Sequence, residues 1–414
     1  MRKQRARQSR RTATSGVWLR VVAGLAVGAV VGAGGLWIAI HRVPSLGPAL
    51  ADAARSVVGP RAIAWAEDVA YGLQDRVDAW RYRDAPPKAY WDAPGAPPPA
   101  PTEAAPSGQA EPTDVLREQD AITFVPPPFA PPFPKVALPG DGTWVPVPLE
   151  GDGAPIFHKA LVHPDPHRNY AVVAVVSIDL AHVALHEVVG TAEPASDAVP
   201  RSRRSGLVPS ADAEALVAAF NGGWQAIHGH WGMKAEGNVV LPPKPAACTV
   251  AIYRDGRVRI RSWPVVAPDD DEIVAWRQTP PCLVEQGVHH AGLGAEHTRN
   301  WGATVDGETV IRRSALGIDA AGRTLFYGMG DGLTAPSIAR AMAAAGAFDV
   351  AQLDVNFAFP RFLFYGKRGG EKVAVEALVP STTWKPGEYV RQVEYRDFFY
   401  LTRRAEPAVL GGPR

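Results

Sequence analysis

The chain has 414 residues, enough for one large domain or for two small domains with tails. Hydrophobic residues make up 46% of the chain and its formal net charge is only +1, so a substantial core is available and the composition is not that of a nucleic-acid-binding protein. The 40 prolines are densest before residue 150, which separates a proline-rich first part from a globular second part.

The N-terminus has the pattern of a membrane anchor. A head over residues 1–16 carries six basic residues and no acidic one, and residues 21–40 contain no charge at all. An apolar helix of about 20 residues spans a bilayer, and flanking positive charge stays in the cytoplasm. We therefore expect a transmembrane signal anchor over residues 17–41, with a cytoplasmic N-terminus. A cleaved signal peptide is the alternative, although its apolar part is usually shorter, about 7–15 residues.

Residues 61–83 predict an amphipathic helix next to the membrane. Its apolar positions recur at steps of four and three: Trp65, Val69, Leu73, Val77 and Trp80. We expect this face to pack on the domain, with the membrane surface or a partner helix as alternatives. Residues 84–134 are rich in proline and alanine and predict an extended spacer that buries too little apolar surface to order itself.

The globular domain is expected over residues 135–405. In chain order the patterns predict strands over 170–177 and 183–189, a helix over 212–220 with Ser210 as its N-cap, and a hairpin over 250–262. A second hairpin over 315–327, a helix over 334–345 that ends at Gly346, and a strand over 350–353 follow. Strand, helix and strand imply a parallel crossover. The expected fold class is α+β: a mixed sheet with hairpins and one βαβ crossover, preceded by the transmembrane helix and the proline-rich linker.

One candidate site follows the helix expected over residues 212–220. Asn221 offers amide donors and an acceptor, Gly222 and Gly223 let backbone amides approach a ligand, and Trp224 is suited to stack on a sugar. A structural turn with Trp224 in the core is the alternative. His228 and His230 would share one face of a strand, but no third metal ligand is placed by spacing, so we expect His230 and Glu236 at a pocket rim and no metal or cofactor.

Asp354 is the acid best placed for chemistry, because the carboxyl ends of parallel strands are where α/β ligand sites form. A turn or helix-capping aspartate is the alternative. Arg313 stands at the start of a strand, where it would hold a phosphate or a carboxylate if it does not lie solvated at the surface. Cys248 and Cys282 either form a disulfide, which an exported domain permits, or remain buried thiols.

Several of these segments, in order, resemble the phosphodiester glycosidase domain family, which includes enzymes that remove N-acetylglucosamine from mannose 6-phosphate. The resemblance covers about residues 170–365 and is carried by these segments: SIDLAHVAL (177–185), FNGGW (220–224), VAIYRDGRVRI (250–260), PPCLVEQG (280–287) and RSALGIDAAGRTLFYGMGDG (313–332), with Leu353-Asp354 after them. The family's last motif is Leu-Asp-Gly-Gly-Gly-Ser, but here Val355, Asn356, Phe357 and Ala358 replace the glycines and the serine. Glycines there would let backbone amides surround a phosphate, and Val355 and Phe357 would block that approach.

The resemblance implies an exported, membrane-anchored hydrolase of sugar phosphodiesters or envelope glycans, in the periplasm or outside the cell. Asp354 and Asn221 are its expected catalytic residues. The expected substrate-binding residues are Gly222, Gly223, Trp224, His230, Glu236, Arg313 and Asn356. The alternative is an inactive module of the same fold that binds a glycan or a protein. In both hypotheses the partners are the membrane and a sugar ligand, and not nucleic acid.

Overall fold

The computed structural model describes residues 60–92, 124–149, 155–294, 298–302, 310–405 and 407, together with Gly28, Gly32 and Gly35. The chain from Ala64 onward forms one compact unit. The predicted cytoplasmic head and nearly all of the predicted anchor lie outside the described residues. No helix within the described ranges is both long and apolar enough to cross a membrane.

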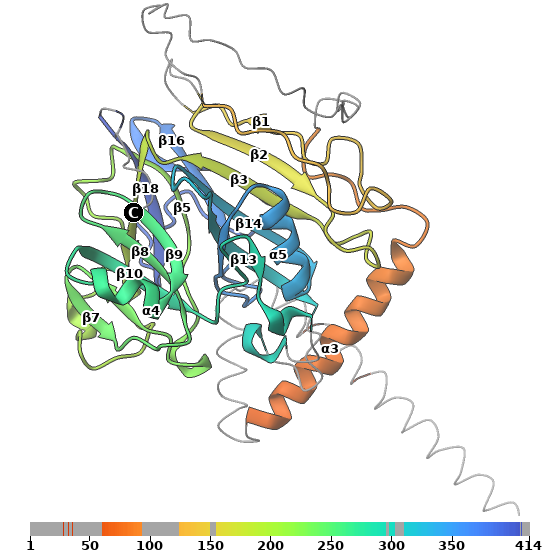
Figure 1. Ribbon diagram of the computed structural model, residues 1–414, viewed down its shortest axis with the longest axis horizontal. Coiled ribbons are helices and arrows are strands. Elements are labelled where there is room, and N and C mark those ends of the chain that lie inside the picture. Colours follow the sequence, from red (N-terminus) through yellow and green to blue (C-terminus); the bar gives the residue numbers. More distant parts are fainter. Residues whose placement is uncertain are drawn as a thin grey trace, which may run out of the picture. The chain divides into compact units, whose positions relative to one another are not determined.

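The domain is built from three antiparallel sheets (Figure 1). The first sheet has eight strands in the order β1 (Val145–Pro146), β2 (Phe157–Val162), β3 (Val173–Asp179), β14 (Thr324–Leu333), β13 (Ile311–Ile318), β15 (Asp349–Gln352), β11 (Val284–Glu285) and β12 (Val288–His289). The second runs β17 (Glu371–Ala377), β16 (Phe362–Arg368), β5 (Leu216–Asn221), β18 (Phe398–Arg403) and β4 (Val183–Val188). The third runs β7 (Asn238–Leu241), β6 (Met233–Ala235), β10 (Ile273–Thr279), β8 (Cys248–Tyr253) and β9 (Val258–Ser262).

Few helices accompany these sheets. The longer ones are α3 (Pro60–Arg81) and α5 (Ala335–Ala344), and α4 (Trp263–Val266) is a single turn. Short 3₁₀ turns cover Arg201–Arg203, Ala226–His228, Ala267–Asp269, Ala291–Leu293 and Thr298–Trp301. The expected α+β class is therefore confirmed in its coarse form, with sheet dominant.

The first sheet is buried on both faces, and β3 shows how. Ala174, Val176 and Ile178 enter the main core together with residues of the second and third sheets, whereas Val173 and Val175 pack against α5 on the opposite face. This is the alternation expected of a strand, in which successive side chains point to opposite faces. The sheet is thus covered by α5 on one side and by strands on the other.

The predicted mixed sheet is wrong, because every strand ladder of the described residues is antiparallel. Both β14 and β15 pair antiparallel with β13, so they run parallel to each other with β13 between them. The crossover through α5 therefore exists, but it is split by an intervening strand. The two predicted hairpins are confirmed as β8–β9 and β13–β14, and α5 begins at the N-cap Thr334 as expected.

The helix predicted over residues 212–220 is wrong. Leu216–Asn221 forms strand β5, every residue of which is buried between β16 and β18. Alanine-rich sequence favours a helix in isolation, but a central strand gains two ladders of hydrogen bonds and full burial, and this tertiary context overrides the local preference.

Helix α3 is confirmed, but the prediction that its apolar face packs on the domain is wrong. Val69, Leu73, Val77 and Trp80 are exposed, and the helix contacts the domain through the opposite, polar face. There Asp75 accepts two hydrogen bonds from Arg168, at 3.0 and 3.2 Å, and one from the hydroxyl of Tyr170.

Both ends of the predicted proline-rich spacer pack on the domain. Tyr90 and Trp91 lie against the main core, and Phe129 contacts Trp144, whose indole N–H donates to the carbonyl of Pro127. The expectation that the whole stretch stays unpacked is therefore wrong for these ends. Residues 93–123 lie outside the described residues.

A disulfide joins Cys248 on β8 to Cys282 in the segment after β10, with Cα atoms 4.7 Å apart. It resolves the two alternatives for the cysteines in favour of the disulfide.

Candidate functional site

A small hollow lies where the loop after β5, the loop after β15 and the segment before β18 converge. Its empty volume is about 200 Å³, and its lining consists of Asn221, Gly222, Asp354, Phe359, Tyr389, Glu394, Arg396 and Asp397. This volume includes open solvent, and the enclosed space is about that of one water molecule. A ligand larger than one small polar group would therefore require the lining to open.

Asp354 is fixed at this hollow by its backbone and its side chain. Its N–H donates to the carbonyl of Gly222 at 3.1 Å, and its carbonyl accepts from the hydroxyl of Ser314 at 2.8 Å. One carboxylate oxygen accepts from the N–H of Asn356 at 3.0 Å, and the other pairs with Arg396. The residue as a whole is 5% exposed. The structure thus brings two predicted residues, Asp354 and Gly222, into direct contact.

Arg396 is the cation of the hollow, and only part of its guanidinium is hydrogen-bonded. It is 3% exposed, and its guanidinium lies 3.6 Å from the centre of the Phe359 ring. One nitrogen pairs with Asp354, whereas the buried Nε and Nη2 have no hydrogen-bond partner among the described residues. Leaving such donors without a partner costs free energy, and an anionic or carbonyl oxygen that reached them would offset this cost.

Backbone hydrogen bonds hold the segment that carries Arg396 against the loop after β4. Thr191 N–H donates to the carbonyl of Glu394, and the N–H groups of Ala192 and Glu193 donate to that of Tyr395. A Cβ on Gly190 would lie 2.2 Å from the carbonyl carbon of Arg396. The glycine therefore permits the close approach that holds Arg396 in place.

Gly222 and Gly223 serve packing rather than ligand approach. Their N–H groups donate to the carbonyl and the carboxylate of Asp397, at 3.0 and 2.7 Å. A Cβ on Gly222 would lie 2.1 Å from that carboxylate, and a Cβ on Gly223 would lie 2.6 Å from the guanidinium of Arg277. Both amides are committed, so the expectation that they contact a ligand does not match this geometry.

Beneath these glycines Arg277 and Asp397 form a buried ion pair, 2.9 Å from Nε to the carboxylate. The guanidinium also donates to the carbonyls of Trp224, Trp231 and Gln278. Arg277 therefore holds the turn that forms one wall of the hollow.

The amide of Asn221 is fully engaged inside the protein. Its nitrogen donates to Ser314 and to the carbonyl of Gly222, and its oxygen accepts from the Tyr327 hydroxyl at 2.7 Å and from the N–H of Arg361. An amide has two donors and one acceptor oxygen with two lone pairs. Asn221 lines the hollow, but its contacts are those of a positioning residue.

Glu394 brings a third carboxyl group to the hollow, after Asp354 and Asp397. Burial raises the pKa of this carboxyl, with the nearby Arg361 acting in the opposite direction. Its neighbour Tyr389, also in the lining, is almost completely buried, and this burial raises its phenol pKa well above the ordinary value. One hollow therefore combines Asp354, held by a guanidinium, with a carboxyl group whose neutral form is favoured.

Two predicted binding residues are buried away from the hollow's lining. The indole N–H of Trp224 donates to the carbonyl of Leu353 at 2.8 Å, so this ring is a core side chain and not an exposed platform for a sugar. Arg313 is 1% exposed and donates to the carbonyls of Leu333 and Trp301, and burial lowers its pKa to about 9. The anion-holding role expected of Arg313 fits Arg396 instead.

Phe357 does not fill the hollow. It is 41% exposed and packs against the guanidinium of Arg312, 4.0 Å from the ring centre. Phe359, two residues later, occupies the lining instead. Asn356 is half-buried and caps this loop: its N–H donates to Asp354 and its side chain accepts from Ala358.

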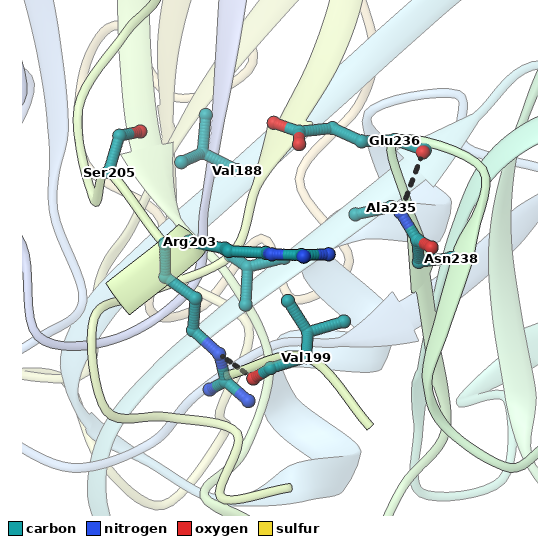
Figure 2. A pocket seen from close by; sticks show the side chains of 9 residues that line it. Val188, Val199, Arg203, Ser205, Ala235, Glu236 and Asn238 are labelled. Atoms are coloured by element: carbon teal, nitrogen blue, oxygen red, sulfur yellow. Dashed lines mark hydrogen bonds between the residues drawn. The ribbon is translucent and has the colours of Figure 1, made fainter. Parts of the chain in front are cut away.

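The remaining two predicted residues lie elsewhere. Glu236 lines a different hollow of about 310 Å³ between the β4 side and β6–β7, where its carbonyl accepts from Asn238 (Figure 2). His230 is exposed and lines neither of the two hollows. The structure therefore does not bring them to Asp354. Among the described residues, no group of three or more His, Cys, Asp or Glu is arranged to hold a metal.

Glu187 on β4 is a further acid near Arg277 and Asp397. Both carboxyl oxygens are buried and have no hydrogen-bond partner in the described part of the chain. Burial, followed by the charge of Asp397, raises the pKa of this carboxyl group well above its usual 4.5. A folded pKa above the unfolded one means that stability is highest below about pH 4.5 and falls as pH rises toward the folded pKa.

We therefore expect Glu187→Gln, which cannot ionise, to flatten this decline. Urea midpoints measured from pH 4 to pH 9 should diverge from the wild type upward of pH 4.5, with the variant more stable at the alkaline end. The matching change at the exposed Glu236 is the control. Parallel profiles for wild type and Glu187→Gln would show that Glu187 does not carry this pH dependence.

Sequence reasoning did not find Arg396, Glu394, Asp397 or Arg277. The nearest signal was local: Arg396 and Asp397 directly precede the apolar run of β18, as polar residues at a strand start. Nothing in their spacing links them to Asp354, because the contact spans 42 residues and depends on how the second sheet packs beside the first.

Comparison with known proteins gives a distant structural likeness and no family. No family model and no curated protein matches the chain. A zebrafish N-acetylglucosamine-1-phosphodiester alpha-N-acetylglucosaminidase catalytic domain, auto-inhibited by its pro-peptide, is 13% identical with a TM-score of 0.41, over 62% of this chain and 86% of that one. A hypothetical protein from Synechocystis is 10% identical with a TM-score of 0.38, over 60% of this chain and 62% of that one. A protein from Burkholderia pseudomallei described as a putative exported protein is 12% identical with a TM-score of 0.27, over 56% of this chain and 74% of that one. The chain is similar to these structures only at this remote level.

Proposed function

We propose that the domain is a hydrolase of glycosidic bonds, acting on a sugar linked to an anionic or polar group. One observation carries the proposal: besides Asp397, a single hollow is lined by two carboxyl groups in different environments, Asp354 and Glu394, and by a buried arginine with two donors that lack a partner among the described residues. Glycoside cleavage uses a pair of carboxyl groups around an oxocarbenium-like transition state.

Each lining residue has a role in this proposal. Asp354 stabilises or captures the positive charge that develops on the sugar, because its carboxylate is already held beside Arg396. Glu394 donates a proton to the leaving oxygen, since the half-buried position of its carboxyl group raises the pKa and favours the neutral form. The free Nε and Nη2 of Arg396 bind an oxygen of a phosphate or carboxylate on the substrate.

The proposed location is the far side of a membrane. The apolar run over residues 17–41 would anchor the chain, and the Cys248–Cys282 disulfide supports an oxidising compartment. Envelope glycans and sugar phosphodiesters are the substrate classes found there.

A glycan- or protein-binding module is the second candidate. Phe359 and Arg396 narrow the hollow, and the amides of Gly222 and Gly223 are already taken by Asp397. A binding module would retain the ligand without turnover.

The test is a panel of sugar-1-phosphodiesters and uncharged glycosides incubated with the whole protein, with sugar release followed by mass spectrometry. We expect release from the anionic members and weaker release from the uncharged ones. Retention of a glycan without release supports the binding module. If the protein neither releases sugar nor retains a glycan, both candidates are contradicted.

The pH dependence of turnover tests the role of Glu394. Because its neutral form is the proton donor, activity should fall as pH rises through its raised pKa, and Glu394→Gln should lower turnover about 10²-fold or more and remove that alkaline limb. Glu376→Gln, on β17 and paired with Lys159, is the control. An unchanged alkaline limb in Glu394→Gln would assign the proton donor to another group.

A further inference from the structure

Helix α3 has two unlike faces over its described side chains. Tyr71, Asp75 and Asp78 are half-buried on the side that meets the domain. Asp75 is the main contact: it binds Arg168 and Tyr170, and just beyond the helix the carbonyl of Tyr82 accepts from Asn169 at 2.7 Å. The domain is thus attached through a polar face.

The opposite face is an apolar stripe open to solvent. Val69 is 51% exposed, Leu73 61%, Val77 49% and Trp80 75%. Spacings of four, four and three place these side chains in one row along the helix. A row of this kind that the fold itself leaves uncovered indicates an interaction surface.

Charge beside the stripe is basic. Arg76 lies three residues from Leu73 and four from Trp80, and Arg81 lies four from Val77, so both flank the stripe, and both are exposed. The acidic Asp75 and Asp78 lie on the domain-facing side. An apolar face bordered by arginine, with tryptophan on it, is the pattern of a helix that lies in a lipid headgroup region.

We propose that the stripe formed by Val69, Leu73, Val77 and Trp80 binds the surface of an anionic lipid membrane, so that α3 lies along the bilayer and carries the domain on its other side. The inference is independent of the hydrolase activity.

Chain length agrees with this occupant. Only 19 residues, 41 to 59, separate the uncharged run ending at Ile40 from the start of α3, and such a stretch reaches at most about 65 Å. A second copy of α3 fits less well, because pairing two stripes would bring Arg76 and Arg81 of both copies together. Within the described part of the helix, no acidic side chain on that face offsets them.

The experiment uses the full chain reconstituted in vesicles of phosphatidylcholine with or without phosphatidylglycerol. Both native cysteines are in the disulfide, so an introduced cysteine is the single reactive thiol. A nitroxide is attached to Leu73→Cys on the stripe and, as the matched control, to Gln74→Cys on another exposed face. Accessibility to oxygen and to a water-soluble nickel reagent is then compared.

We expect the label at position 73 to become more accessible to oxygen and less accessible to nickel in anionic vesicles, while the label at position 74 stays aqueous. Arg76→Glu combined with Arg81→Glu should reduce the difference. Equal aqueous exposure at both positions, or a chain that does not associate with vesicles, would overturn the proposal. Spin–spin broadening at position 73 that grows with protein density would also overturn it, in favour of a second copy.

Discussion

Asp354→Asn is expected to lower turnover of the best substrate in the panel by roughly 10²–10³-fold, the scale of losing one well-placed electrostatic contact in a transition state. The substitution keeps the shape and the hydrogen bond from Asn356, but it removes the charge that would face the developing positive charge of the sugar. Substrate affinity should fall much less than turnover. Single-turnover rates and equilibrium binding measured side by side separate the two quantities.

Asp269→Asn is the matched control for this variant. Asp269 is also an aspartate paired with an arginine, Arg259, at 2.9 Å, but it lies in the 3₁₀ turn Ala267–Asp269 and outside the lining of the hollow. Its turnover should equal that of the wild type. Equal turnover in Asp354→Asn and Asp269→Asn would remove Asp354 from the mechanism.

Arg277→Met is expected to destabilise the fold by about 3–5 kcal/mol, the cost of breaking a buried ion pair by removing one partner. Arg277 is 0% exposed, and its loss would leave Asp397 without its cation and several carbonyls without donors. Because Asp397 holds the amides of Gly222 and Gly223, the wall of the hollow should loosen as well. Urea unfolding followed by circular dichroism measures the first effect.

Arg257→Met provides the comparison. Arg257 pairs with Asp255 at 2.5 Å, but that pair lies at the surface, where ion pairs contribute about 0–1 kcal/mol. An equal loss of unfolding free energy in both variants would show that the buried pair stabilises the fold no more than a surface pair does.

The two hairpins were predictable from the sequence. Residues 250–262 and 315–327 carry turn residues between apolar runs, and both became hairpins because the signal is local. Strand β5 was not predictable in this way. Its alanines are compatible with a helix, and only pairing with β16 and β18, more than 130 residues away in the chain, makes it a strand.

Helix α3 shows a different limit. Its periodicity was correct, but amphipathic pattern alone does not say what covers the apolar face. The polar residue Asp75 provides the attachment through Arg168 and Tyr170, and those partners lie more than 90 residues later.

The sequence predicted the central acid of the candidate site, Asp354, but not most of the residues that surround it. Asp354 and the Asn221–Gly222 turn do meet. Arg313 attracted attention because it starts a strand, yet the register of β13 directs it to the carbonyls of Leu333 and Trp301. The cation at the hollow, Arg396, comes from a segment whose position depends on packing against Gly190, which no local pattern reports.

A crystal structure of Asp354→Asn soaked with a sugar-1-phosphodiester would show whether the hollow is the catalytic site, because the variant should bind the substrate and turn it over slowly. We expect the ligand in the hollow between the loop after β15 and the segment before β18, with a phosphate oxygen on Nε or Nη2 of Arg396 and the leaving oxygen facing Glu394. An empty hollow still closed by Phe359 and Arg396, or a ligand bound only elsewhere on the domain, would contradict this expectation.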